Sequence, residues 1–245
     1  MQPAPPLPDV DALRKRLNDL RQSRGFLLAH HGALAAAAPD LHDAYVAMYQ
    51  ALTVRERHLA PLERETVWLG ILIAAREGIG THHLELFRAA GGTTGMARAL
   101  TAMTGFAEGF AVLQFAQQHW SGFLPGLDPA GSYVRGLDAL RGDAVAPDVA
   151  ELAMLAVQTI RMDHAAIAHH LTRCYALAIP EDRMVEALAY VIWPRGVNTF
   201  LDACAIWHDL MVAGVVRPSP RYQVWADTPA GPFKAGSKVG GFTPG

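Results

Sequence analysis

A set of residues recurs in this chain in the same order at a nearly constant separation. The matches are Tyr45-Val46 with Tyr133-Val134, His82-His83-Leu84 with His169-His170-Leu171, Gly109 with Gly196, and Trp120 with Trp207. The separation is 88 positions for the first pair (133 − 45) and 87 for the others (169 − 82). An ordered set of such matches is hard to obtain by chance, and the period is too long for a solenoid. The chain is therefore predicted to hold two tandem copies of one domain, packed as a pseudo-dimer.

The apolar pattern indicates helices throughout. Asp9 is a candidate N-cap, apolar residues follow it at helical spacing, and Gly25 is expected to end that helix. Gly91-Gly92 is expected to close a later helix in the same way, and Asp148 is a candidate N-cap in the second half. Since no segment of any length alternates with the period of a strand, the predicted class is all-α.

Proline and glycine suggest the boundaries of the parts. We expect an N-terminal helix plus repeat one at 1–121, a linker at 122–131, repeat two at 132–216 and a Pro/Gly-rich C-terminal arm at 217–245. The composition of the arm is expected to exclude a regular helix. The arm is either a disordered tail or a segment laid over this chain or a neighbour, with Trp225, Phe233 and Phe242 as anchors.

Composition limits the kinds of partner and the cellular location that are expected for this chain. The net charge of −2 over 245 residues favours neither a nucleic-acid partner nor a membrane surface. Two cysteines, Cys174 and Cys204, do not make a disulfide framework, so a reduced, cytoplasmic location is expected. Residues 1–8 lack the pattern of a signal peptide, and the longest apolar run, Val67 to Ala75, is too short to span a bilayer.

The second repeat is richer in chemistry. Asp163, His170 and Cys174 are spaced by 7 and 4 residues, which returns to nearly one helix face. Glu151 lies one predicted helix earlier and is expected to fold against that stripe. The equivalent residues in repeat one, at the 87-residue separation, are Arg64, Arg76, His83 and Phe87. Only the histidine is kept, although a shift of one residue would restore a carboxylate from Glu63, Glu65 or Glu77.

An apolar helix, a histidine, a glycine eight residues later and an acidic helix start resemble the carboxymuconolactone decarboxylase and alkylhydroperoxidase D superfamily. The residues are His83 with Gly91 in repeat one, and His170 with Ala178 before Ile179-Pro180-Glu181-Asp182 in repeat two. Pro194-Arg195-Gly196 before an Ala-rich helix is also similar. The resemblance covers about residues 41–120 and 130–212. It implies a tandem duplication of an alkylhydroperoxidase D-like helical domain forming an intrachain pseudo-dimer, and assembly of chains into a dimer or trimer.

The chain departs from the peroxidase members of this superfamily. They carry Cys-x-x-Cys-x-x-x-His, whereas the two cysteine positions hold Asp163 and Ala166 before His170, and Arg76 and Ile79 before His83. Because thiol peroxidases need a low-pKa thiolate and a resolving partner, peroxidase activity is expected to be absent. What remains resembles the decarboxylase branch, which uses neither a metal nor an organic cofactor.

The resemblance implies an enzyme acting on a small carboxylated lactone or keto acid. His170 is the expected proton donor and acceptor, oriented by Glu151 and Asp163, with Cys174 in the same site. Arg76 or Arg195 is expected to hold the substrate carboxylate. His83 and Asn198 complete the expected substrate-binding set.

Other interpretations stay open. The histidines are alternatively buried structural residues, and the fold is alternatively a ligand-binding scaffold without chemistry. A metal site built from Glu151, Asp163, His164, His169 and His170 is disfavoured because no two of these histidines are four residues apart. Trp120 and Trp207 are expected to be packing anchors, and Cys204 a core residue.

Overall fold

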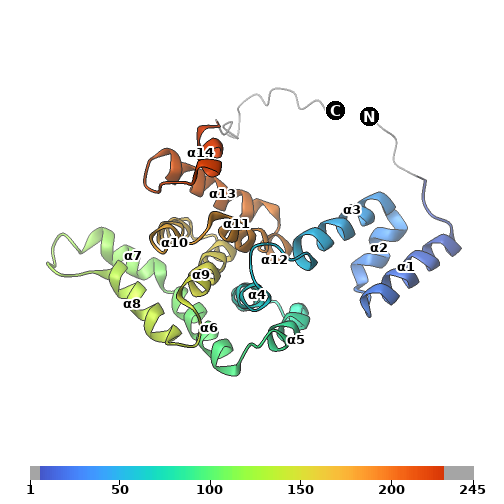
Figure 1. Cartoon of the computed structure of the whole chain (residues 1–245), viewed down its shortest axis with the longest axis horizontal. Helices are drawn as coiled ribbons and strands as arrows, with labels where there is room; N and C mark the ends of the chain where they lie inside the picture. Colours follow the sequence, from blue (N-terminus) through green and yellow to red (C-terminus); the bar gives the residue numbers. More distant parts are fainter. Residues whose placement is uncertain (1–5, 229–245) are drawn as a thin grey trace. The chain divides into compact units, whose positions relative to one another are not determined.

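Every regular element that the structure describes is helical. The computed structural model describes residues 6–228. The described residues divide into two compact units between residues 56 and 57 (Figure 1). The all-α class predicted from the sequence is confirmed for the described part of the chain.

The N-terminal unit contains α1 (Val10–Arg24), α2 (Ala29–Ala37), α3 (Pro39–Tyr49) and the π-helical turn η1 (Gln50–Val54). As predicted, Asp9 caps α1 by accepting from the amide of Ala12, and Gly25 ends it with φ 78°. Two of the few buried side chains are His31 and His42, whose rings are joined by a contact of 3.0 Å between Nδ1 and Nε2. The centre of this unit is therefore polar.

The second unit contains the remaining helices. They are α4 (Pro61–Ala75), η2 (Ile79–Thr81), α5 (His82–Ala89), α6 (Thr94–Ala107), α7 (Phe110–His119), α8 (Pro129–Arg141), α9 (Pro147–Arg161), α10 (His164–Ala176), α11 (Glu181–Ala189), α12 (Ile192–Arg195), α13 (Val197–Val212) and α14 (Pro220–Asp227). Helix α9 is buried from Val149 to Ile160 and packs against both α4 and α10. Gly70 of α4 allows close packing there, because an added Cβ would lie 3.3 Å from Val157.

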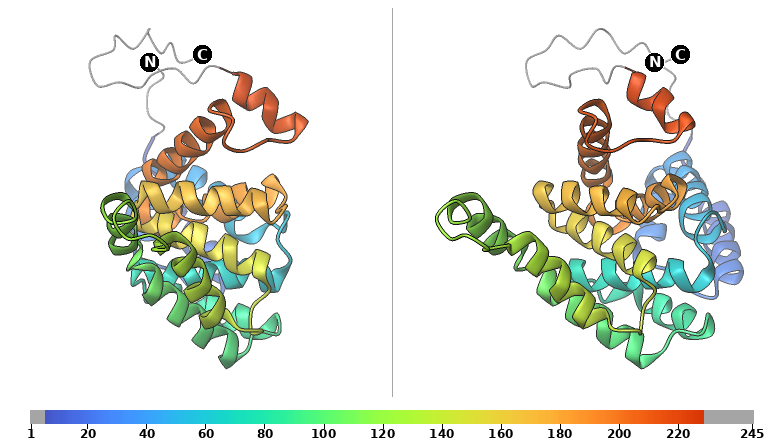
Figure 2. Two further views of the ribbon diagram at one scale, coloured as in Figure 1. Left: turned by 90° about the vertical axis from the view of Figure 1, so that its left-hand side faces the viewer. Right: turned by 60° about the vertical axis from the view of Figure 1, so that its left-hand side comes forward.

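The predicted boundary at 122–131 is not where the compact units divide. That segment holds most of the turn between α7 and α8 and the start of α8, and α8 packs on α6 and α7 as well as on α9 (Figure 2). Because α8 crosses back over helices of the first half, the turn lies inside one unit. The sequence reveals turn residues but not this packing, and the division at 56/57 carries no comparable proline–glycine signal.

Helix α14 corrects the prediction for the C-terminal segment. A regular helix spans Pro220–Asp227, with Pro220 in its first turn, where a missing N–H costs nothing. Its Trp225 contacts buried Trp207 edge to face, so this predicted anchor lies against the chain's own second unit. Phe233 and Phe242 lie outside the described residues. Trp120, the predicted counterpart of Trp207, is 51% exposed and is not a core anchor.

Two pairs of helices have matching ends. Helices α4 and α9 both begin with proline in the first turn and end at a left-handed residue, Arg76 and Met162. The left-handed residues Gly91 and Ala178 follow α5 and α10. Asp148, the predicted N-cap of α9, instead lies inside its first turn and accepts from Arg183, while Ala146 holds the cap position.

Within residues 6–228, no single helix combines the length and apolar character needed to cross a membrane. The bent pair α6 and α7 meets those criteria only when its two helices are taken together.

Candidate functional site

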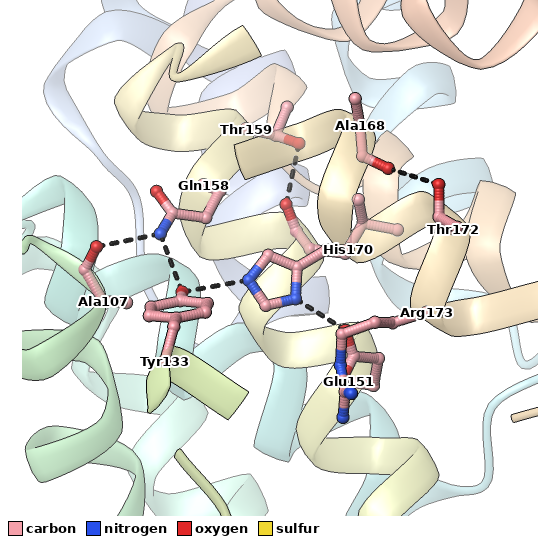
Figure 3. A network of polar contacts seen from close by, with 10 residues as sticks. Ala107, Tyr133, Glu151, Gln158, Thr159, Ala168, His170, Thr172 and Arg173 are labelled. Atoms are coloured by element: carbon pink, nitrogen blue, oxygen red, sulfur yellow. Dashed lines mark hydrogen bonds and ion pairs between the residues drawn. The ribbon is translucent and has the colours of Figure 1, made fainter. Parts of the chain in front are cut away.

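A buried glutamate–histidine pair joins α9 to α10. His170 is fully buried, and its Nδ1 lies 2.6 Å from Oε1 of Glu151 (Figure 3). The sequence predicted this proximity of Glu151 and His170. A carboxylate only accepts hydrogen bonds, so an ionised Glu151 accepts a hydrogen bond from Nδ1–H of His170.

Arg173 completes the surroundings of the carboxylate. It lies almost one turn after His170 on α10, and its Nε donates to Oε2 of Glu151 at 2.9 Å. Burial alone would raise the pKa of Glu151. The hydrogen bonds from His170 and Arg173, together with the charge of Arg173, outweigh that effect and hold the pKa below its usual value. Glu151 is thus maintained as an anion in a nearly solvent-free position.

The other ring nitrogen of His170 faces α8. Nε2 lies 3.0 Å from the hydroxyl of Tyr133, and that hydroxyl lies 3.1 Å from the amide nitrogen of Gln158. The same amide nitrogen donates to the carbonyl of Ala107 at 2.9 Å. Tyr133 and Gln158 are both fully buried, and burial raises the pKa of the Tyr133 phenol. Tyr133 therefore stays protonated and serves as a hydrogen-bonding hydroxyl.

The carboxylate of this pair borders a cavity of about 490 Å³. Glu151 and Arg173 line it, together with Asp138 and Arg141 of α8. The rest of the wall is formed by Met103, Leu137, Pro147, Ala150, Met154 and Leu177. His170 is not part of the lining, so Glu151 stands between the histidine and the cavity. This cavity has the size of a small-molecule site, and its wall combines apolar side chains with four charged ones.

The segment predicted to be repeat one contains the same kind of pair. Nδ1 of His83 lies 2.7 Å from Oε2 of Glu65, and Nε of Arg64 donates to Oε1 of Glu65 at 2.9 Å. The 87-residue separation aligns Arg64 with Glu151, whereas the carboxylate that contacts His83 is that of Glu65, one residue further on and one of the three alternatives left open by the sequence. Trp68 stacks on His83 with 4.3 Å between ring centroids, and Tyr190 also stacks on Trp68, at 5.0 Å.

Asp163 and Cys174 do not act with His170 as the predicted stripe of acid–base groups. Asp163 is the N-cap of α10 and accepts from the amide of Ala166 at 3.0 Å, so its carboxylate holds the start of the helix. Cys174 is fully buried, and burial raises its pKa well above the usual value of a thiol. It is poorly suited to act as a nucleophile. Cys204 is only partly buried.

The predicted cationic residues lie away from this cavity's lining. Arg76 ends α4, its side chain is 81% exposed, and it lines a separate hollow of about 430 Å³ beside Leu72 and Leu84. Arg195 and Asn198 are exposed around the break between α12 and α13. His83 is buried in the pair of repeat one. The structure therefore does not gather Arg76, Arg195, Asn198 and His83 around Glu151.

Four residues of the site were not predicted from the sequence: Tyr133, Gln158, Arg141 and Arg173. Tyr133 carried a signal, since it matches Tyr45 in the repeat, but nothing connected it to His170. Among residues 6–228, no group of three or more His, Cys, Asp and Glu side chains has an arrangement that would hold a metal ion. No protein-family model, curated protein or solved structure matches this chain.

Proposed function

We propose that this chain is an enzyme that performs cofactor-free acid–base chemistry on a small carboxylated lactone or keto acid. The reaction is a decarboxylation or a related proton shift, as the resemblance to carboxymuconolactone decarboxylases implies. One observation carries the proposal: an anionic Glu151, held by His170 and Arg173, borders a cavity that also contains Arg141.

The two guanidinium groups are the proposed contacts for a substrate carboxylate in a cavity wall that also holds the carboxylates of Asp138 and Glu151. Arg173 uses Nε for Glu151 and Arg141 uses Nη1 for the carbonyl of Val145, so other N–H groups of both remain for a ligand. Guanidinium groups bind carboxylates through paired hydrogen bonds. Leu137 and Met154 are among the apolar residues against which the body of the substrate would pack.

Glu151 is the proposed proton carrier. In an isomerisation it removes the proton from the carbon next to the substrate carbonyl and returns it elsewhere on the conjugated system. In a decarboxylation the bond to the carboxylate breaks and its electron pair delocalises onto the carbonyl oxygen. Glu151 then delivers to the carbon a proton that it has taken up from a hydronium ion of the solvent, and it returns to its ionised form as CO₂ leaves. His170 donates to Glu151 throughout and moderates its basicity.

We further propose that α3–α7 and α8–α13 are the two copies of an alkylhydroperoxidase D-like domain, forming the intrachain pseudo-dimer. The recurring Glu–His pairs and the matching helix ends support this duplication. Assembly of chains into a homodimer or homotrimer, and a cytoplasmic location consistent with two free thiols, are parts of the same proposal.

A second candidate function is ligand binding or scaffolding without chemistry. The pair of Glu65 and His83 favours it, because that pair is buried beside Trp68 and resembles a purely structural ion pair. If Glu151 and His170 also form a purely structural pair, replacing either residue would change only the free energy of unfolding.

The test is turnover of a panel of carboxylated lactones and β-keto acids. CO₂ release and exchange of substrate C–H with deuterium are measured for the wild type, Glu151→Gln and His170→Ala. Turnover by the wild type alone, with variants that remain folded, supports the enzyme. The absence of both reactions in the wild type would favour the scaffold. Peroxide consumption, measured in parallel, is expected to be absent because there is no Cys-x-x-Cys pair.

A further inference from the structure

A chain of buried polar groups runs from a backbone carbonyl to the proposed catalytic carboxylate. It passes from the carbonyl of Ala107 through Gln158, Tyr133 and His170 to Glu151, with heavy-atom distances of 2.9, 3.1, 3.0 and 2.6 Å (Figure 3). Gln158, Tyr133 and His170 are fully buried, and none of the three lines the cavity. The direction of the hydrogen bonds along this chain determines which group carries each proton.

The carbonyl of Ala107 fixes the orientation of the Gln158 amide. A carbonyl oxygen only accepts, so the amide atom 2.9 Å away from it must be the nitrogen. That nitrogen has a second N–H, and the hydroxyl oxygen of Tyr133 lies 3.1 Å from it. Gln158 therefore donates to Tyr133.

The orientation of Tyr133 follows from that of Gln158. The hydroxyl accepts from Gln158 and has one proton to donate, and Nε2 of His170 is the acceptor within reach at 3.0 Å. If Nε2 instead carried a proton, two donors would face the hydroxyl oxygen. Its own proton would then have no acceptor among the described contacts. Nε2 is thus unprotonated, and the ring proton of His170 resides on Nδ1.

We propose that Tyr133 and Gln158 are positioning residues that hold His170 as its Nδ1–H tautomer and keep Glu151 ionised at the cavity wall. The catalytic consequence rests on the proposed function, because an ionised Glu151 is what takes up the proton. With the opposite direction of hydrogen bonding, Glu151 would carry a proton towards Nδ1 and would be unable to act as a base.

The neighbouring charges leave this arrangement intact. Arg173 donates to the second oxygen of Glu151 and favours its ionised form. His169, beside His170 on α10, has its pKa lowered to about 4, with burial as the largest cause, and is neutral near pH 7. Arg161 and Asp163 act on Tyr133 with opposite signs. The hydrogen-bond chain is therefore the feature that distinguishes one tautomer from the other.

The direct test is nitrogen NMR of the full chain labelled with ¹⁵N-histidine, with His170 identified by its loss in His170→Gln. Protonated and unprotonated ring nitrogens resonate far apart, and the wild type is expected to show a protonated Nδ1 and a hydrogen-bonded, unprotonated Nε2. Tyr133→Phe should shift the Nε2 signal towards that of a nitrogen without a donor. Tyr190→Phe, which removes a hydroxyl from another buried tyrosine bonded to Glu186, should leave both signals unchanged.

Gln158→Glu should reverse the direction of the hydrogen bonds along this chain. The new side chain accepts a hydrogen bond from the Tyr133 hydroxyl, and the hydroxyl oxygen then accepts one from a protonated Nε2 of His170. A protonated Nε2 in the wild type, or an Nε2 signal unaffected by Tyr133→Phe, would overturn the proposal. If Gln158→Glu does not fold, the Tyr133→Phe comparison decides.

Turnover separates this inference from the proposed function. On an active substrate, Tyr133→Phe should lower kcat by about tenfold or more with little change in KM, and Tyr190→Phe should change neither. If the NMR spectra show an unprotonated Nε2 in the wild type but no substrate is turned over, the inferred tautomer is supported and the proposed enzymatic function is not.

Discussion

The carboxylate of Glu65 lies 2.7 Å from Nδ1 of His83, and both side chains are buried. Glu151 and His170 stand in the same relationship at 2.6 Å. The two pairs differ in what surrounds them. Trp68 stacks on the ring of His83, whereas the carboxylate of Glu151 borders a cavity with two guanidinium groups. This difference indicates why one pair is proposed to be structural and the other catalytic.

Arg141 is expected to contribute to substrate affinity. Arg141→Gln should raise KM by about tenfold or more, because a charge-assisted hydrogen bond to the substrate carboxylate is worth about 1.5–3 kcal/mol. The measurement is steady-state kinetics on an active carboxylated substrate. Arg135→Gln is the matched control, since Arg135 lies on the same helix with its side chain 66% exposed and paired with Asp128. Equal KM values for the wild type and Arg141→Gln would remove Arg141 from the site.

The two thiols should be inert in the folded protein. Burial raises the pKa of Cys174 well above its usual value and that of Cys204 to about 11. Because the thiolate is the reactive form, alkylation by iodoacetamide at about pH 8 should be at least about tenfold slower in the folded than in the unfolded chain. Mass spectrometry of timed samples gives both rates. Rapid labelling of Cys174 in the folded protein would contradict its described burial.

The N-terminal unit should lose stability in mild acid. Burial, followed by the charges of neighbouring groups including Arg24, lowers the pKa of His31 from 6.5 to about 4. The unfolded chain therefore takes up a proton below about pH 6.5 that the folded chain refuses. This contribution to stability is fully present above 6.5 and is lost as the pH falls towards 4.

The expected loss between about pH 7.5 and about pH 5 is about 2 kcal/mol in the free energy of unfolding. Denaturant unfolding at both pH values measures it for the wild type and for His31→Gln, which does not titrate. If the wild type and His31→Gln show the same pH dependence, His31 is not the group responsible.

Ala178 should tolerate glycine with a gain in stability. Its φ of 53° is left-handed, a conformation that costs an alanine but not a glycine, and Gly91 follows α5 with a φ of 96°. Ala178→Gly should raise the free energy of unfolding by about 0.5–1 kcal/mol. Ala168→Gly, inside α10, should lower it by about 1 kcal/mol. Thermal unfolding that ranks Ala178→Gly below the wild type would count against the described backbone.

The sequence predicted the helical class and the proximity of Glu151 to His170. The apolar residues recur with the 3.6-residue period of a helix. Glu151 and His170 are 19 residues apart with one helix break between them, so they are expected on two consecutive helices that pack face to face. The spacing rule failed for Asp163, because a residue that caps a helix uses its carboxylate for a backbone amide. The alignment of the predicted repeats missed Glu65 because Glu65 and His83 are 18 residues apart, whereas Glu151 and His170 are 19 residues apart.

Other parts of the site depend on packing that spacing does not reveal. Tyr133 and His170 are 37 positions apart in the chain. They meet only because α8 folds back against α6 and α7. Arg141 enters the cavity wall from the same helix. Helix α14 forms within a segment with many prolines because Pro220 occupies the one turn that tolerates it.

The central claim is tested most directly by comparing Glu151→Gln with Glu65→Gln. Both changes neutralise a buried carboxylate that contacts a histidine and an arginine, so both should lower the free energy of unfolding by a similar amount, about 2–3 kcal/mol. Turnover of the best carboxylated substrate and the unfolding transition are measured on the same samples. The account predicts that Glu151→Gln loses at least about a hundredfold in kcat while Glu65→Gln retains it. Equal turnover in the two folded variants would contradict a catalytic role for Glu151.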